Sequence, residues 1–185
     1  MTYYGAKELA DSFRTVRKNT ITIAEEIPED RYSFRPAPDA RTVAQTLIHM
    51  ADATKLPAHI HGTLKLKTLE GFDFFGFFGA MMAEQENPPG KAEILKRLNE
   101  HGNRFADWMG SLSESFLAER VSFPAGMTPP DKTRFEMLLG PKEHEMHHRA
   151  QLMVIQRMLG IVPHLTRQMN ERMAAMTAAQ KKTSA

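Results

Sequence analysis

The feature that most constrains the fold is a helical spacing of apolar residues that recurs along the chain. In residues 6–26 such positions follow one another at alternating intervals of four and three, which places them on one face of an α-helix. This face comprises Leu9, Phe13, Val16, Thr20, Ile23 and Ile27. Residues 91–112 repeat the spacing with Ile94, Leu98, His101, Phe105, Trp108 and Leu112. Helices that are apolar on one side must bury that side, so the pattern predicts an all-α, four-helix bundle.

Two capping boxes predict where the other two long helices begin. Thr42 precedes Gln45 by three residues, and Thr133 precedes Glu136 by the same interval, so in each case a hydroxyl can cap the helix that follows. The helix after Thr42 carries an apolar arc with His49 on its flank. The helix after Thr133 should continue to Gly160, and the internal pair 140–141, a glycine and a proline, is expected to kink or split it.

Other segments lack a clear helical period. Residues 29–41 should form an extended connector, and residues 113–131 a loop or a short turn of helix. The phenylalanine-rich segment 72–78 could pack against the bundle, cover a pocket or meet a second subunit, and packing is the preferred interpretation. No strand-like alternation is found. His59 and His61 are expected to be exposed. Residues 1–165 should form the bundle and residues 166–185 a helical or disordered tail, with disorder expected from residue 180.

The composition excludes several classes of function. The chain has 185 residues, enough for one domain with a sizeable core, and no cysteine, so only histidine, carboxylate or carbonyl groups could hold a metal. The formal charge of +2 is small, and basic and acidic residues are interspersed, which argues against nucleic acid as a partner. The sequence has no secretory signal and no apolar stretch that could span a bilayer, so we expect a cytoplasmic protein with no membrane partner.

Two histidines stand on the apolar face of the last long helix. At about 100° per residue, His144 and His148 lie within about 40° of each other, beside Ile155 and Leu159. Imidazoles at such positions need partners for their ring nitrogens, and a divalent metal would supply one. The competing interpretation is a pair of core-edge histidines that bond to backbone or water. For His101, alone in its stripe, that second interpretation is preferred to a ligand role.

The same residues match the H-E-x-x-H pattern of zinc metallopeptidases. In that interpretation His144 and His148 bind zinc, Glu145 is the general base, and Glu171 is the best downstream candidate for a third ligand. Glu145, however, is expected on a polar face about 100° from His144, together with Arg149 and Gln156. Because no sheet edge is predicted to hold a peptide, the metallopeptidase interpretation is disfavoured.

Two motifs resemble the DinB superfamily of DinB/YfiT-like proteins. The segment 32–36 leading to 41–51, with its histidine at position 49, is similar to the family's proline-containing connector and second helix. The segment 144–152 is similar to its fourth-helix signature, and helix order and spacing agree over about residues 5–165. The family usually has glycine where this chain has Ala150, and the Gly140-Pro141 pair is a larger departure.

The resemblance implies a fold, a metal site and a quaternary structure. It implies a four-helix bundle in up-down-down-up order, often a homodimer, with one divalent ion, zinc or nickel, held by His49, His144 and His148. Three residues are expected just outside that ligand set: His147, Gln151 and Arg149.

Three neutral imidazoles leave a coordination position open for water or a small thiol. The resemblance therefore implies a metal-dependent enzyme that acts on a small molecule, either a transferase with a low-molecular-weight thiol as cosubstrate or a hydrolase. Two alternatives stay open: a zinc metallopeptidase that uses the HEMHH motif, and a non-catalytic metal-binding or stress-induced interaction protein. No general base is evident from the residues.

Overall fold

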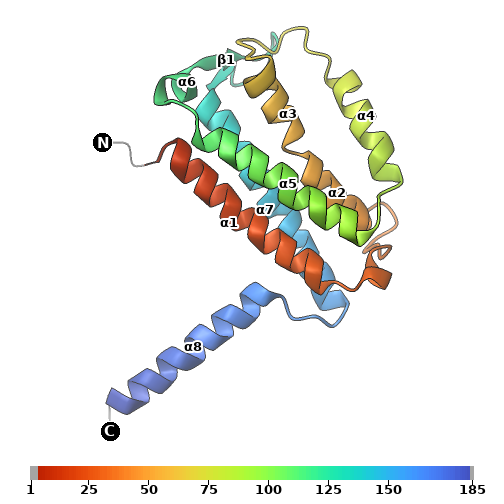
Figure 1. The fold of residues 1–185 in the computed structure, drawn as a ribbon, viewed down its shortest axis with the longest axis vertical. Coiled ribbons are helices and arrows are strands. Elements are labelled where there is room, and N and C mark those ends of the chain that lie inside the picture. The colour runs from red at the N-terminus through yellow and green to blue at the C-terminus, as the bar shows by residue number, and fades with distance from the viewer. Residues whose placement is uncertain (1–3, 184–185) are drawn as a thin grey trace.

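Long helices packed side by side form the body of the molecule. The computed structural model describes residues 4–183 and has its long bundle helices at α1 (Ala6–Glu26), α2 (Val43–Asp52), α5 (Lys91–Gly110) and α7 (Arg134–Met158). Helix α1 packs against α5 and α7, and α2 packs against α5 (Figure 1). The predicted all-α bundle is confirmed, and both predicted capping boxes cap their helices, through Thr42 with Gln45 and Thr133 with Glu136.

The segment between α2 and α5 is more ordered than its sequence suggested. A short helix α3 (Lys55–Pro57) leads into a π-helical turn η2 (Ala58–Thr63), and the phenylalanine-rich segment begins a further helix, α4 (Phe74–Glu86). Figure 1 shows α4 standing at one side of the bundle, beyond α2 and α3. The expectation that His61 is exposed is wrong, because only 1% of its surface is accessible.

Residues 120–133 contain two short strands, which corrects the prediction of no strand structure. Helix α6 (Glu114–Ala118) precedes strand β1 (Arg120–Ser122), which pairs antiparallel with β2 (Asp131–Thr133). The connector between α1 and α2 contains the 3-10 turn η1 (Glu29–Arg31). Helix α7 starts directly at the end of β2 and runs without interruption past Pro141, so the expected split does not occur.

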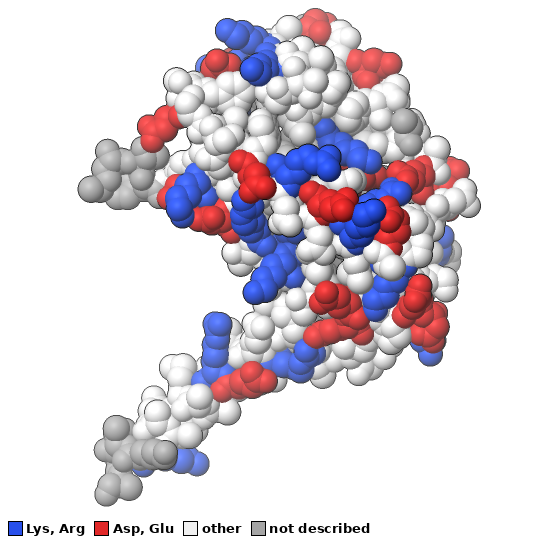
Figure 2. Space-filling view, viewed as in Figure 1, with Lys and Arg blue, Asp and Glu red and all other residues white. Residues whose placement is uncertain are grey.

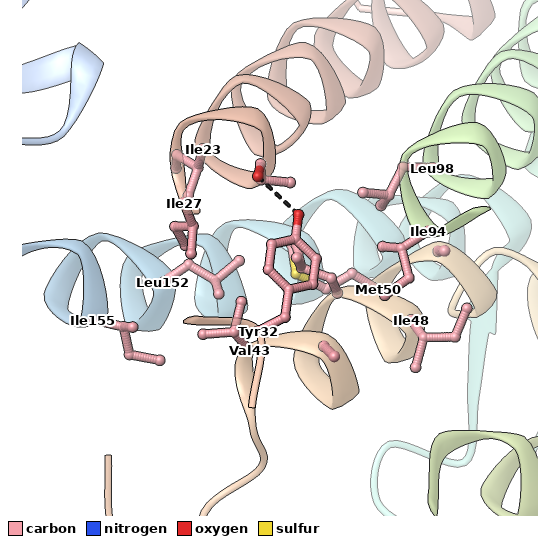
Figure 3. Packing of buried hydrophobic residues seen from close by; sticks show 14 residues of the cluster. Ile23, Ile27, Tyr32, Val43, Ile48, Met50, Ile94, Leu98, Leu152 and Ile155 are labelled. Atoms are coloured by element: carbon pink, nitrogen blue, oxygen red, sulfur yellow. Dashed lines mark hydrogen bonds between the residues drawn. The ribbon is translucent and has the colours of Figure 1, made fainter. Parts of the chain in front are cut away.

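Two apolar clusters fill the bundle. One surrounds Ile23, Leu47 and Leu152, and the hydroxyl of Tyr32 closes it by donating a hydrogen bond to the carbonyl oxygen of Ala24 at 2.8 Å (Figure 3). The other, toward the opposite end of α1, surrounds Phe13 and includes Phe105 and other residues of α5. The stripe predicted for α1 supplies apolar residues to both clusters.

A buried ion pair ties together all four long helices. Arg17 of α1 donates through Nε to both carboxylate oxygens of Glu145 in α7, at 2.7 and 2.9 Å. Its Nη atoms donate to the backbone carbonyls of Leu98 in α5 and Met50 in α2, at 2.8 and 3.0 Å. Gly102 makes room for the guanidinium chain, because a Cβ there would stand 2.9 Å from Arg17 Cγ. The prediction that Glu145 lies on a polar face is therefore wrong.

The last helix, α8 (His164–Thr183), leaves the body of the bundle (Figure 1). Its first turn is anchored to α1, where Glu26 accepts a hydrogen bond from Arg167 of α8 at 2.5 Å and a second one from Gln156 of α7 at 3.0 Å. Helix α8 continues to residue 183 and so includes residues 180–183 of the segment that was expected to be disordered. Residues 184–185 lie outside the described part.

Charged residues of both signs are mixed over the surface seen in Figure 2, as the sequence suggested. Among the described helices, none combines the length and the apolar character needed to cross a membrane.

Candidate metal centre

The candidate centre joins α2 to α7. His49 stands in the last turns of α2, and His144 and His148 are one turn apart in α7. One ring nitrogen from each of the three histidines lies within 4.8 Å of the others. The structure thus brings together the three residues that the resemblance implied. His49 reaches them because Ile48, Met50 and Ala51 bury the other faces of α2 in the core.

One ring nitrogen of each histidine faces the other two histidines. His49 Nε2 and His144 Nε2 are 3.0 Å apart, and the rings of His49 and His148 meet edge to face with centroids 4.9 Å apart. Two imidazole nitrogens on one tetrahedral zinc ion stand about 3.3 Å apart, given Zn–N bonds of about 2.0–2.1 Å. The spacing between His49 and His144 is therefore close to what a shared metal ion requires, and the donor set fits a divalent cation.

Burial keeps these histidines neutral. It lowers the pKa of His49 and of His144 to about 4, and it also lowers the pKa of His148. The positive charge of Arg41 acts on all three pKa values in the same direction. Only neutral imidazole has the lone pair that binds a metal, so the three candidate ligands are in the form that can bind one at neutral pH.

Gln151 orients His148. The Nδ1–H of His148 donates to Gln151 Oε1 at 2.8 Å, which leaves Nε2 as the nitrogen with a free lone pair. The amide nitrogen of Gln151 in turn donates to His147 Nε2 at 3.2 Å. His147 and Gln151 thus lie just outside the three ligand candidates, where the sequence placed them. Arg149 is not in this hydrogen-bonded group: it lies near His164 of α8, whose pKa is lowered by burial and, to a smaller extent, by the charge of Arg149.

The other predicted site residues lie elsewhere. Glu145 is held by Arg17, although it follows His144 directly in the chain. Glu171, the third ligand of the metallopeptidase interpretation, is exposed on α8. His101 Nδ1 contacts the backbone oxygen of Ala51 at 3.2 Å, which is the core-edge role preferred for it. Neither Glu145 nor Glu171 belongs to the histidine cluster.

A cavity of about 600 Å³ opens beside the histidines and exposes His49 and His144 on its wall. Apolar side chains from α3, α4, η2 and α7 line most of it: Leu56, Ile60, Phe78, Met81, Met82 and Met137. A second cavity of about 720 Å³ is lined by His147, His148 and Gln151. Connector residues 39–41 line both cavities, so they pass over the candidate centre between them.

Sequence reasoning missed three residues of this region. Arg41 of the connector brings a positive charge to the three histidines, and Gln85 of α4 is a hydrogen-bond partner that raises the pKa of His49 against the larger effect of burial. His61 lines the cavity from η2. The proline-containing connector hinted at Arg41, but no local pattern pointed to Gln85 or His61.

Comparison with known protein families identifies the chain. The model of the DinB superfamily matches residues 12–152, which is more than half of the sequence and includes all three histidines. The chain belongs to the DinB superfamily. A search of curated proteins found no significant match to this DinB-superfamily protein.

Solved structures show the same fold at low sequence identity. YfiT from Bacillus subtilis, described as "a probable metal-dependent hydrolase with an unusual four-helix bundle topology", aligns with a TM-score of 0.67 and 15% identity, covering 87% of this chain and 91% of YfiT. The DinB-like protein YjoA, also from Bacillus subtilis, gives a TM-score of 0.61 and 20% identity over 83% of this chain and 92% of its own. A DinB-like protein from Bacillus cereus gives a TM-score of 0.63 and 18% identity, and the alignment covers 88% of this chain and 97% of that protein.

Proposed function

We propose that this DinB-superfamily protein is a metal-dependent enzyme that acts on a small molecule bound in the 600 Å³ cavity. His49, His144 and His148 would hold one divalent ion, zinc or nickel, with Gln151 fixing the orientation of His148. When bound, such an ion lowers the pKa of a water or thiol and so supplies a nucleophile near neutral pH. The observation that carries the proposal is the convergence of three neutral imidazoles, two of which, His49 and His144, stand on the wall of a mostly apolar cavity.

The chain's own residues would perform the remaining tasks. The apolar side chains of α4 and η2 exclude water from the cavity and bind the apolar part of a substrate. Arg41 places a positive charge beside the histidines, where it would attract a thiolate or a negatively charged oxygen that develops on the substrate. The same positive charge would repel a metal cation and so weaken its binding by the three histidines.

The reaction would be transfer to a small thiol or hydrolysis. The description of YfiT as a probable metal-dependent hydrolase supports the hydrolytic version. The second cavity, lined by His147 and His148, offers a separate space for a cosubstrate and supports the thiol-dependent version. A non-catalytic metal-binding protein would not need an apolar cavity against its ligands. A metallopeptidase of the HEMHH type would need Glu145 near the ligands, whereas Glu145 is buried against Arg17.

Cobalt substitution tests this proposal. Cobalt(II) bound by three histidines should give the intense visible absorption of a four-coordinate site, and 2-mercaptoethanol should add a near-ultraviolet charge-transfer band if the open position accepts a thiol. His148→Ala should lose both signals, while His59→Ala, a control in η2 outside the cavity lining, should keep them. Visible absorption without a thiol band would leave the hydrolytic version, and no specific cobalt binding would contradict the metal-dependent proposal.

A further inference from the structure

His61 is a polar residue of the 600 Å³ cavity wall that lies outside the histidine cluster, and the other polar residues of that wall are Arg35, Asp39, Arg41, Gln45, Gln85 and Glu86. His61 lies in the π-helical turn η2, a rare backbone form that often occurs at functional sites. Its side chain lines the cavity although only 1% of its surface is accessible. Gly62 lets the turn approach α5 closely, because a Cβ there would stand 3.2 Å from the indole of Trp108.

Arg134 fixes the tautomer of His61. The Nη1 of Arg134 lies 2.9 Å from His61 Nδ1, and a guanidinium can only donate, so Nδ1 must accept and the ring proton must sit on Nε2. Arg134 cannot turn away, since it also bonds Glu119 Oε2 at 3.0 Å and the backbone oxygen of Lys65 at 3.2 Å. The guanidinium is fully buried and stacks over the ring of Phe116 at 4.5 Å.

The cavity runs along one stripe of α7. Arg134, Met137, Pro141 and His144 follow at intervals of three, four and three, and the last three of them line the cavity. His144 follows Arg134 by ten positions in α7, which is about 15 Å along the helix axis. The cavity wall therefore combines the ring of His61, held by Arg134, with the α7 residues Met137, Pro141 and His144.

We propose that His61 Nε2–H is a substrate-binding donor, and that the cavity takes molecules with a carbonyl or similar acceptor on an apolar chain. This inference rests on the proposed function, because it names the class of substrate that the same site would bind. A cationic amine fits poorly, because an ammonium group has no lone pair to accept from Nε2–H and would approach the buried charge of Arg134. Arg134 is the positioning residue that keeps the proton on Nε2.

Octanamide and octylamine make a matched pair of probes with the same chain and opposite head groups. On the protein as purified, calorimetry should show octanamide binding about tenfold more tightly, the effect of one hydrogen bond in a dry site. His61→Phe should reduce the preference to within about twofold, whereas His59→Phe, in the same turn but outside the cavity lining, should retain it. Equal binding of the two probes, or an unchanged preference in His61→Phe, would overturn the proposal.

Nitrogen NMR of the wild type provides a measurement that does not depend on a substituted chain. It should show a neutral His61 with its proton on Nε2, and octanamide should shift that resonance. A proton on Nδ1, or no shift at saturating octanamide, would overturn the assignment. The measurement is repeated after chelation of metal. A carbonyl preference that survives chelation would support a role of His61 that is independent of the metal. A wild-type protein that holds no metal after reconstitution but keeps the preference would count against the proposed metal-dependent function and leave the role of His61 standing.

Discussion

Glu145→Gln isolates the structural role of the residue that a peptidase motif would make catalytic. The side chains of Arg17 and Glu145 are 5% and 3% accessible, so the substitution leaves a guanidinium charge buried without its counter-ion. Breaking such a pair costs about 3–5 kcal/mol. The amide oxygen of the glutamine can still accept one hydrogen bond, and Arg17 keeps its hydrogen bonds to the carbonyl oxygens of Leu98 and Met50. We therefore expect a loss of unfolding free energy at the lower end of this range, about 3 kcal/mol.

Urea unfolding followed by circular dichroism measures this free energy. A second variant, Arg17→Met with Glu145→Gln, removes the charge as well and should regain at least about half of the lost stability. The metal content of folded Glu145→Gln should equal that of the wild type, because the carboxylate faces Arg17 and not the histidines. A loss of stability below about 1 kcal/mol, or a double variant less stable than Glu145→Gln, would refute the assignment of a buried ion pair.

Three further substitutions test other parts of the structure. Thr42→Ala should lower the free energy of unfolding by about 1 kcal/mol through loss of the cap on α2, and an unchanged urea midpoint would contradict this. Arg41→Gln should raise the affinity for a divalent ion about two- to fivefold at low salt, an effect that calorimetry should find reduced at high salt. The pKa of His61 is about 4 in the folded state and about 6.5 in the unfolded chain, so the unfolded chain binds a proton first as the pH falls. Between pH 6.5 and pH 4 this lowers the free energy of unfolding by up to about 3 kcal/mol. His61→Gln should therefore show a shallower loss of stability between pH 6.5 and pH 4 than the wild type, and parallel pH curves would contradict the burial of a neutral imidazole.

Features encoded by local periodicity were predictable. The long helices and their caps follow from apolar spacing and from Thr-Gln or Thr-Glu pairs three residues apart, and the convergence of His144 and His148 follows from helical geometry alone. His49 is 95 residues away from His144 in the sequence, so only the family resemblance could associate the two. The strands β1 and β2 are three residues each, too short to show an alternation.

The errors concern buried polar groups whose partners are distant in the chain. Glu145 was placed on a polar face because a helical projection shows which residues share a side, but not which side meets another helix. Its partner Arg17 is 128 residues away. His61 was expected to be exposed because it follows Pro57 in a region of weak pattern, and the residue that buries and orients it, Arg134, is 73 residues away.

The most direct test of the candidate centre is the metal content of the purified and reconstituted protein. We predict about one divalent ion per chain, lost in each of His49→Ala, His144→Ala and His148→Ala and kept in His59→Ala. Loss in the α7 variants alone, with full metal in His49→Ala, would show that a different third ligand completes the site. A wild-type protein that holds no metal after reconstitution would contradict the central claim that these three histidines form a metal centre.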